Sequence, residues 1–504
     1  MFHVDIGCGL KKAEVSDKRQ VLLRTTSGTQ PGRADRLHPR ATIEALPDNV
    51  LLETFELHLG KDDADEVYSN RNYDGWQTLV HVCHRWRYIV FASPRRLDLR
   101  LFCTQQRLVN SKALDNWPAL HIVILAKDMK SKEDTTNIIA ALRHHNRVRK
   151  VYYSNGQFQD SFLREFATIN EPFPALTSLG LLSFAQNVPV LPDSFLGRSA
   201  PRLGSLHLFG IPYPLIGKLL SSTTNLVQLT LWRIPHSGYI SPRTIVSCLS
   251  MLPMLKFLRL GFRYPRSLAH RASRHPPPMT RVIFPNLIIL RFGGDIEYLE
   301  DMLSQIETPM LNQSDFCFFN RLVFDTPLLE QLMRRTETFM TFHTARVQFL
   351  DWAVVVTLSE QEQMDLNIRQ ALRLEISCKA LDWQISAVSQ VLNRFPPSLP
   401  ILESLNIEVS HGDWQGEIEV TQWREFFHPF NSVKGMTLVF GDSIRLIAPA
   451  IQELARERAT EVLPALQDIF LRTYDWQPSG PVKEAIQQLI STRQLHGHPV
   501  TVHY

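Results

Sequence analysis

The first regular pattern of apolar positions along this chain starts near residue 46 and has the spacing of a helix. The apolar side chains fall on one stripe, three or four positions apart, at Leu46, Val50, Leu51, Phe55 and Leu59. Pro47 suits the first turn of such a helix, because its missing N–H would have no partner there. The acidic and polar residues 61–75 that follow indicate a solvated loop.

A second helical pattern runs from residue 76 to residue 90. Its stripe alternates spacings of three and four, at Trp76, Leu79, Cys83, Trp86 and Val90. Val82 and Ile89 widen the stripe, and Ser93-Pro94 predicts its end, because the residue before a proline is pushed out of the helical region. The two helices are amphipathic and too small to bury their apolar sides alone. We therefore expect this end of the molecule to dock against a partner.

After this helical part the spacing of apolar residues changes to that of strands. Alternation predicts strands at residues 97–101, 120–124 and 148–153, with a helix at residues 136–145. A repeat of the form Leu-x-x-Leu-x-Leu then recurs through the rest of the chain. Its copies are Leu176/Leu179/Leu181, Leu203/Leu206/Leu208, Leu226/Leu229/Leu231, Leu255/Leu258/Leu260, Leu287/Leu290/Phe292, Leu402/Leu405/Ile407 and Leu466/Ile469/Leu471.

This repeat predicts a solenoid. The first five copies are 27, 23, 29 and 32 residues apart, which suits one strand and one helix or irregular return per unit. No single unit can bury its own leucines, so neighbouring units stack and build one continuous core. We therefore predict an α/β repeat fold over residues 105–504. The pattern blurs between the fifth and sixth copies, where residues 371–376 form a degenerate copy.

The residues between the repeat leucines are candidates for binding a protein target. Successive side chains alternate across a strand, so these positions face away from the core. They include His207, Phe209, Gln228, Trp232, Arg259 and Arg291, with Thr230, Asn406 and Glu408 at equivalent positions. Trp and Arg are enriched among the residues that dominate binding energy at interfaces. The alternative is an ordinary surface, or one that a neighbouring loop covers.

The two helical motifs together resemble the F-box. The resemblance rests on Leu46-Pro47-x-x-Val50-Leu51-Leu52-x-x-Phe55 and on Trp76-x-x-Leu79-x-x-Val82-Cys83-x-x-Trp86-Arg87-x-Ile89. The run Ser-Pro-Arg-Arg-Leu-Asp-Leu-Arg-Leu follows at residues 93–101. With that run, the chain is similar to the F-box-like proteins that are abundant in mushroom-forming fungi.

The resemblance implies a small helical module over residues 41–104 that binds Skp1, the adaptor of cullin-RING ubiquitin ligases. It also implies that the repeat domain recruits a protein substrate. The residues that would contact the adaptor or form the module's core are Leu46, Pro47, Val50, Leu51, Phe55, Leu79, Val82, Cys83, Trp86 and Ile89. Spacing alone leaves open which of them face the adaptor. The join from Phe55 to Val82 spans 27 positions, longer than in the common F-box, and favours a repeat scaffold without ubiquitin coupling as the alternative.

The distribution of charge adds a basic leader to the predicted organisation and leaves the rest of the prediction unchanged. Residues 1–40 hold eight Lys and Arg against four Asp and Glu, and their mixed composition indicates a disordered basic leader. The other 464 residues hold 46 of each, so we expect no nucleic-acid partner. No apolar run approaches the ~20 residues of a membrane-spanning helix, and we expect no membrane partner.

The reactive residue types do not point to an enzyme. Six scattered cysteines without a C-x-x-C pair favour a reducing intracellular compartment, cytoplasmic or nuclear. His81, Cys83 and His84 lie close together, but no further ligand with a standard spacing follows, so we expect no metal. The chain lacks the nucleophile-elbow, phosphate-loop and H-E-x-x-H motifs, and we expect neither a cofactor nor a catalytic residue. The sequence therefore favours a non-enzymatic protein, and the F-box resemblance implies that it is a substrate-recognition subunit of an SCF-type ubiquitin ligase.

Overall fold

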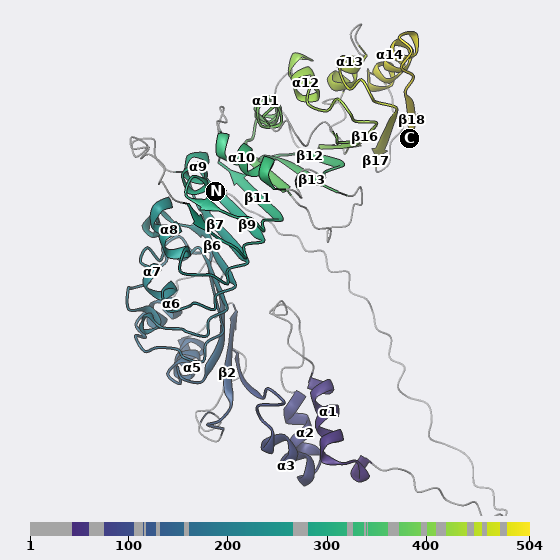
Figure 1. Ribbon diagram of the computed structural model, residues 1–504. Helices are drawn as coiled ribbons and strands as arrows, with labels where there is room; N and C mark the ends of the chain where they lie inside the picture. Colours follow the sequence, from purple (N-terminus) through teal and green to yellow (C-terminus); the bar gives the residue numbers. More distant parts are fainter. Residues whose placement is uncertain are drawn as a thin grey trace, which may run out of the picture.

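The computed structural model shows a long arc of strands with a small helical unit at one end (Figure 1). It describes residues 43–59, 75–104, 114, 117–127, 132–155, 161–265, 281–319, 326–336, 339, 341–360, 372–394, 401–409, 420–440, 448–455, 461–473 and 481–503. The predicted basic leader and all but the last residue of the predicted acidic loop lie outside these ranges.

The helical unit consists of one short turn and three helices. They are η1 (Ile43–Ala45), α1 (Asp48–Leu59), α2 (Gly75–Val82) and α3 (His84–Ala92). We call this unit the helical module. The prediction of one continuous second helix is wrong, because Cys83 separates α2 from α3 with an extended backbone (φ −156°, ψ 171°). Its sulfur accepts a hydrogen bond from the Trp86 N–H, so Cys83 caps α3 and is exposed, whereas the stripe predicted a core position.

The repeat domain is built on one sheet whose strands are almost all parallel. Its sixteen described strands lie in the order β1 (Arg100–Thr104), β2 (His121–Lys127), β3 (Val148–Asn155), β4 (Ser178–Ser183), β5 (Ser205–Phe209), β6 (Gln228–Ile234), β7 (Phe257–Phe262), β9 (Ile289–Gly294), β11 (Gln313–Phe318), β14 (Leu372–Ser377), β13 (Ala353–Ser359), β12 (Thr344–Leu350), β15 (Ser404–Val409), β16 (Gly435–Phe440), β17 (Asp468–Thr473) and β18 (Thr501–His503). A separate pair joins β8 (Val282–Ile283) to β10 (Ile306–Glu307).

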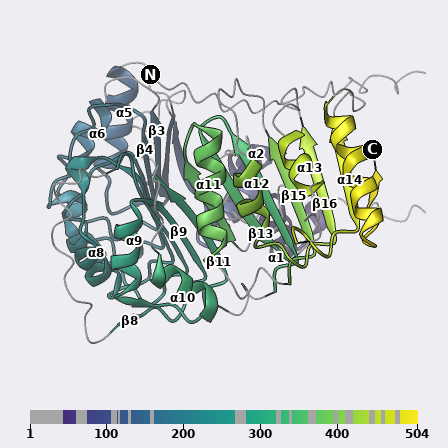
Figure 2. The ribbon, with the colours of Figure 1, turned by 90° about the horizontal axis from the view of Figure 1, so that it is seen from above.

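Helices line the outer side of the arc, and the strands line its inner side (Figures 1 and 2). They are α5 (Lys132–Leu142), α6 (Ser161–Phe166), α7 (Gly217–Leu220), α8 (Pro242–Leu249), α9 (Ile296–Leu303), α10 (Pro327–Arg335), α11 (Leu381–Leu392), α12 (Val420–Phe427), α13 (Ala448–Leu454) and α14 (Pro481–Leu495), with the short turns η3 (Phe195–Arg198) and η4 (His236–Gly238). The inner surface of the strands is called the concave face below.

The repeat leucines form ladders across neighbouring strands. Leu179, Leu206, Leu229, Leu258 and Leu290 stand in register from β4 to β9, and each is at most 1% exposed. Burying one such side chain contributes roughly 1.5–3 kcal/mol, and no unit could do so without its neighbours. The predicted α/β repeat fold is confirmed, and the repeat domain is an irregular leucine-rich-repeat solenoid.

The solenoid loses its regularity where the sequence repeat blurs. After β11 the chain passes over two strand positions to form β12, turns back as the antiparallel strand β13, and then inserts β14 between β11 and β13. The next repeat continues on the far side, because β15 pairs in parallel with β12. The predicted degenerate copy at residues 371–376 corresponds to β14.

The first strand begins later than predicted. Residues 94–98 form a turn in which Asp98 takes a left-handed backbone (φ 46°), and β1 starts only at Arg100. Leu97 and Leu99 are buried nonetheless. Their alternation therefore predicted two core residues correctly, although neither lies in a strand.

Candidate protein-interaction surfaces

Four of the ten F-box-like positions form the interior of the helical module. Leu51, Phe55, Leu79 and Ile89 are each at most 6% exposed. The ring of Phe55 lies 4.7 Å from that of Trp86, which is half-buried against the same core. These side chains hold α1, α2 and α3 together and are covered by the chain itself.

The exposed positions of the motif gather at one end of the module. Pro47, Val50, Val82 and Cys83 are exposed, and Leu46 is half-buried. Arg85 joins the start of α3 to the start of α1, because its guanidinium binds the Leu46 carbonyl and the Asp48 carboxylate, each at 2.6 Å. Val82 and Cys83 directly precede α3, so they lie at the end where α1 begins. We call Leu46, Pro47, Val50, Val82 and Cys83 the module tip.

The opposite side of the module is fixed to the repeat domain by aromatic packing. Trp76 and Phe91 lie against Trp117, with ring centroids 5.6 and 4.4 Å away. The Trp76 indole N–H donates to the Arg100 carbonyl of β1 at 3.0 Å. The chain thus covers one apolar side of its own helices and holds the module in a set orientation at the end of the sheet.

The turn between the module and β1 carries a shared ion pair. Asp98 binds the guanidinium of Arg100 and, through its other oxygen, that of Arg149 on β3 at 2.5 Å. Burial, and then the nearby charge of Arg149, lowers the pKa of Arg100 to about 10. This contact gives a structural role to the Asp and Arg of the run at residues 93–101.

The candidate target-binding residues alternate with the buried leucines, as predicted. Gln228 is exposed, and His207, Phe209, Trp232, Arg259 and Arg291 are half-buried. They stand in register across the concave face: His207, Thr230, Arg259 and Arg291 form one row, and Phe209 and Trp232 lie side by side in the next. Thr230 belongs to the first row but is only 8% exposed. Asn406 and Glu408 lie on β15, further along the arc.

Trp232 lies flat across two glycines of the neighbouring strands. A side-chain carbon on Gly261 would stand 2.4 Å from the indole ring, and one on Gly293 would stand 2.6 Å from it. The guanidinium of Arg259 lies over the same ring, 4.0 Å from its centroid. Gly293 is thus a strand residue that makes room for Trp232.

A second stack lies beside the first. The Arg291 guanidinium is 5.4 Å from the centroid of Phe257, which pairs with Ile289 in the register of β7 and β9. The repeat pattern did not single out Phe257, although its place two residues before Arg259 puts it on the same face of β7. We call Trp232, Phe257, Arg259 and Arg291 the Trp232 platform.

His207 is neutral at physiological pH. Its pKa is lowered from 6.5 to about 4, chiefly because burial disfavours the charged ring and further because Arg259 is nearby. A neutral imidazole adds hydrogen-bonding capacity beside the platform without adding charge.

The edge of the sheet next to the concave face is hollowed. A pocket of about 400 Å³ lies among the loops that follow β4, β5 and β6, lined by Arg164, Gln186, Asn187, Val188, Pro189, Val190, Gly210, Pro235, Ser237 and Arg263. Arg263 also donates to the Ala185 carbonyl at 3.3 Å. The lining has two arginines and no acidic side chain, so any charge it presents is positive.

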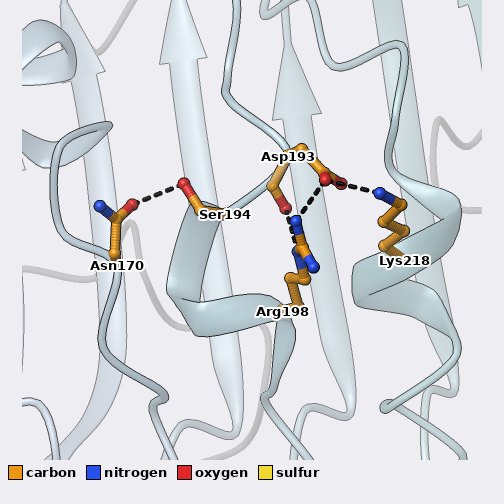
Figure 3. A network of polar contacts seen from close by, with 5 residues as sticks. All are labelled: Asn170, Asp193, Ser194, Arg198 and Lys218. Carbon is orange, nitrogen blue, oxygen red and sulfur yellow. Dashed lines mark hydrogen bonds and ion pairs between the residues drawn. The ribbon is translucent and has the colours of Figure 1, made fainter.

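Polar contacts in the outer layer connect neighbouring repeats. Asp193 binds Arg198 at 2.5 Å and Lys218 at 2.6 Å, and Ser194 donates to Asn170 at 2.6 Å (Figure 3). The hydrogen bond from Lys218 lowers the pKa of Asp193. Because Arg198 and Lys218 are exposed, we expect the network to set repeat geometry more than stability.

The described ranges contain no grouping of three or more His, Cys, Asp or Glu residues that could hold a metal ion. Within the same ranges, no helix is both long and apolar enough to cross a membrane.

The chain is similar to the leucine-rich repeat-containing protein LegL7 from Legionella pneumophila, with 14% identity over 67% of this chain and 97% of that chain, and a TM-score of 0.28. A likeness at this level carries no argument about function. No protein-family profile and no curated protein matches the chain.

Proposed function

We propose that this chain is the substrate-recognition subunit of an SCF-type ubiquitin ligase. The helical module binds a Skp1-type adaptor through its tip, and the concave face of the solenoid binds a protein target. The chain performs no chemistry itself. It raises the effective concentration of the target near the subunits that transfer ubiquitin.

One observation carries the adaptor half of this proposal. The three helices lie outside the repeat sheet and bury one apolar side on Trp117, yet Val50 remains 36% exposed and Val82 59% exposed at the module tip. Apolar side chains at the open end of a small helical unit are typical of a docking site. The resemblance of the motif to the F-box implies that a Skp1-type adaptor would cover these two side chains.

The target half rests on the shape and composition of the concave face. A curved row of strands presents Trp, Phe and Arg side chains on one surface, and these residue types dominate binding energy at interfaces. The aromatic cluster around Trp76 holds the module in place relative to this face. A target bound there therefore sits at a fixed position relative to the adaptor.

Binding of purified Skp1 to the full chain tests the adaptor half. Val50→Glu/Val82→Glu places two charges at the tip without changing the buried core, and we expect affinity to fall about thirtyfold or more, equivalent to one hot spot of about 2 kcal/mol. Leu495→Glu is the matched control, because Leu495 is 85% exposed on α14 at the far end of the solenoid. Equal affinity for the double variant and the control contradicts the proposal.

The second candidate is a protein-binding repeat scaffold without ubiquitin coupling. It is favoured by the burial of four motif residues inside the module, which leaves a small tip for an adaptor. Under this alternative the unmodified chain does not bind Skp1, while the concave face still binds its target.

A further inference from the structure

A long stretch of the solenoid contains no acidic residue. Residues 194–294 hold eleven Arg and two Lys but no Asp or Glu, a net charge of +13 over 101 residues. The remainder of residues 41–504 must then carry −13, since the 46 basic and 46 acidic residues cancel. The charges of residues 41–504 therefore cancel only in total, because the basic residues are concentrated in one stretch of the chain.

Two of these cations share one carboxylate on the outer side of the arc. Arg198 and Lys218 both bind Asp193, the last acidic residue before the stretch begins (Figure 3). The other eleven cations include Arg259 and Arg291 of the concave face.

Arg259 and Arg291 stand on adjacent strands of that face without a carboxylate of their own. Among the described residues neither arginine forms an ion pair, and the buried Nε of each has no hydrogen-bond partner. The nearest acidic residue in the same row is Asp315, on β11 next to Arg291, and Arg373 already binds it at 3.0 Å. Arg373 also binds Glu375, so the acidic side chains beyond the platform have a cation of their own.

The stacking of the two guanidiniums prepares them to receive an anion. Arg259 lies over Trp232 and Arg291 over Phe257, which orients each planar group, and both side chains are half-buried rather than fully enclosed. Burial and the adjacent Arg291 charge lower the pKa of Arg259. The two guanidinium charges stand opposite each other on neighbouring strands and repel each other. A bound ligand with neighbouring negative charges relieves that repulsion.

The choice between a protein and a nucleic acid follows from the aromatic rings. Stacking of bases requires open ring faces. Trp232 has glycines against it and Arg259 over it, Phe257 is covered by Arg291, and Phe209 is packed by Phe184 at 4.8 Å. The platform offers donor edges rather than stacking surfaces, which suits carboxylates.

We propose that the Trp232 platform binds an acidic segment of the target protein, with neighbouring carboxylates received by Arg259 and Arg291. This inference deepens the proposed function, since it names the chemistry of the target. The segment lies extended across β6, β7 and β9, where a continuous row of outward positions meets it.

Fluorescence anisotropy of the labelled peptide Gly-Glu-Glu-Leu-Glu-Glu-Gly, titrated with the full chain, tests this site. We expect Arg259→Gln/Arg291→Gln to weaken binding about tenfold or more, as loss of hydrogen bonds to charged groups implies. The control Arg202→Gln/Lys256→Gln removes the same charge from two exposed positions of the basic stretch and should weaken binding much less. Equal losses in both pairs contradict a site at the platform.

Two further arms complete the experiment. The variant Arg259→Lys/Arg291→Lys keeps both charges but loses the planar guanidinium groups, and we expect it to bind the peptide more weakly than the unmodified chain. It tests the site even if Arg259→Gln/Arg291→Gln does not fold. Tighter binding of an oligouridylate of equal charge, lost in the same variants, overturns the choice of a protein ligand. Skp1 affinity of each chain is measured in parallel. An unmodified chain that binds Skp1 but not the peptide, or platform variants that bind both as tightly as the unmodified chain does, would reject this inference alone.

Discussion

At the scale of single residues, the chain's most specific features are small side chains that make room for large ones. Gly261 and Gly293 allow Trp232 to lie across two strands, and this arrangement places the indole under Arg259. The outward positions of Trp232, Arg259 and Arg291 could be predicted from alternation alone. The role of the two glycines could not, because it depends on which strands become neighbours.

Substituting Gly261 tests that arrangement. We expect Gly261→Ala to lower the free energy of unfolding by about 1–3 kcal/mol, since the new methyl group would overlap the Trp232 ring and force it to move. Gly435→Ala is the matched control, because a side-chain carbon there meets nothing within 4 Å, and its effect should be neutral or stabilising. Urea unfolding of both variants measures the difference, and equal stabilities would contradict the described packing.

His207 gives a prediction for pH dependence. Its pKa is about 4 in the folded chain and near 6.5 when unfolded, so the unfolded chain takes up the proton first as pH falls. The stability contributed by the neutral ring is complete above pH 6.5 and is lost between about pH 6.5 and 4. We expect the free energy of unfolding to fall more steeply from pH 7 to pH 5 for the unmodified chain than for His207→Gln. Parallel curves would show that His207 is freely protonated.

At the scale of elements, seven repeat strands were predictable because each buries leucines or similar apolar residues at the repeat spacing, namely β4, β5, β6, β7, β9, β15 and β17. β16 was not predicted. Its copy of the repeat is Val433, Met436 and Leu438, which are buried like the other repeat residues but include only one leucine. The break between α2 and α3 was not predicted because the apolar pattern continues across it. A single extended residue, Cys83, turns the chain without interrupting the three-and-four spacing of the apolar stripe.

The aromatic joint between the module and the sheet is another property of packed elements. Trp76 is 5% exposed and contacts both Phe91 and Trp117. We expect Trp76→Ala to cost about 3–5 kcal/mol of stability, the usual range for deleting a buried aromatic side chain. Trp352→Ala is the control, because Trp352 is 59% exposed at the tip of the β12–β13 hairpin and should change stability by less than about 0.5 kcal/mol. Similar denaturation midpoints for the two variants would contradict a packed joint.

At the scale of the whole molecule, the arc separates two surfaces with different chemistry. The module tip is small and apolar, whereas the concave face around the Trp232 platform is aromatic and basic. The sequence predicted both surfaces from the F-box-like motif and the repeat. Balanced totals concealed the separation of charge along the solenoid, because a net charge contains no information about position.

The central proposal is that an adaptor covers the module tip, and Cys83 reports on it directly. Cys83 is exposed at the tip, whereas burial raises the pKa of Cys103 and Cys317 to about 12 and leaves them as unreactive internal references. The measurement is the rate of Cys83 alkylation by iodoacetamide, followed by mass spectrometry with and without saturating Skp1. We predict that Skp1 strongly slows the reaction of Cys83 and leaves the two reference thiols unchanged. An alkylation rate that is the same with and without Skp1 would contradict adaptor docking at this tip.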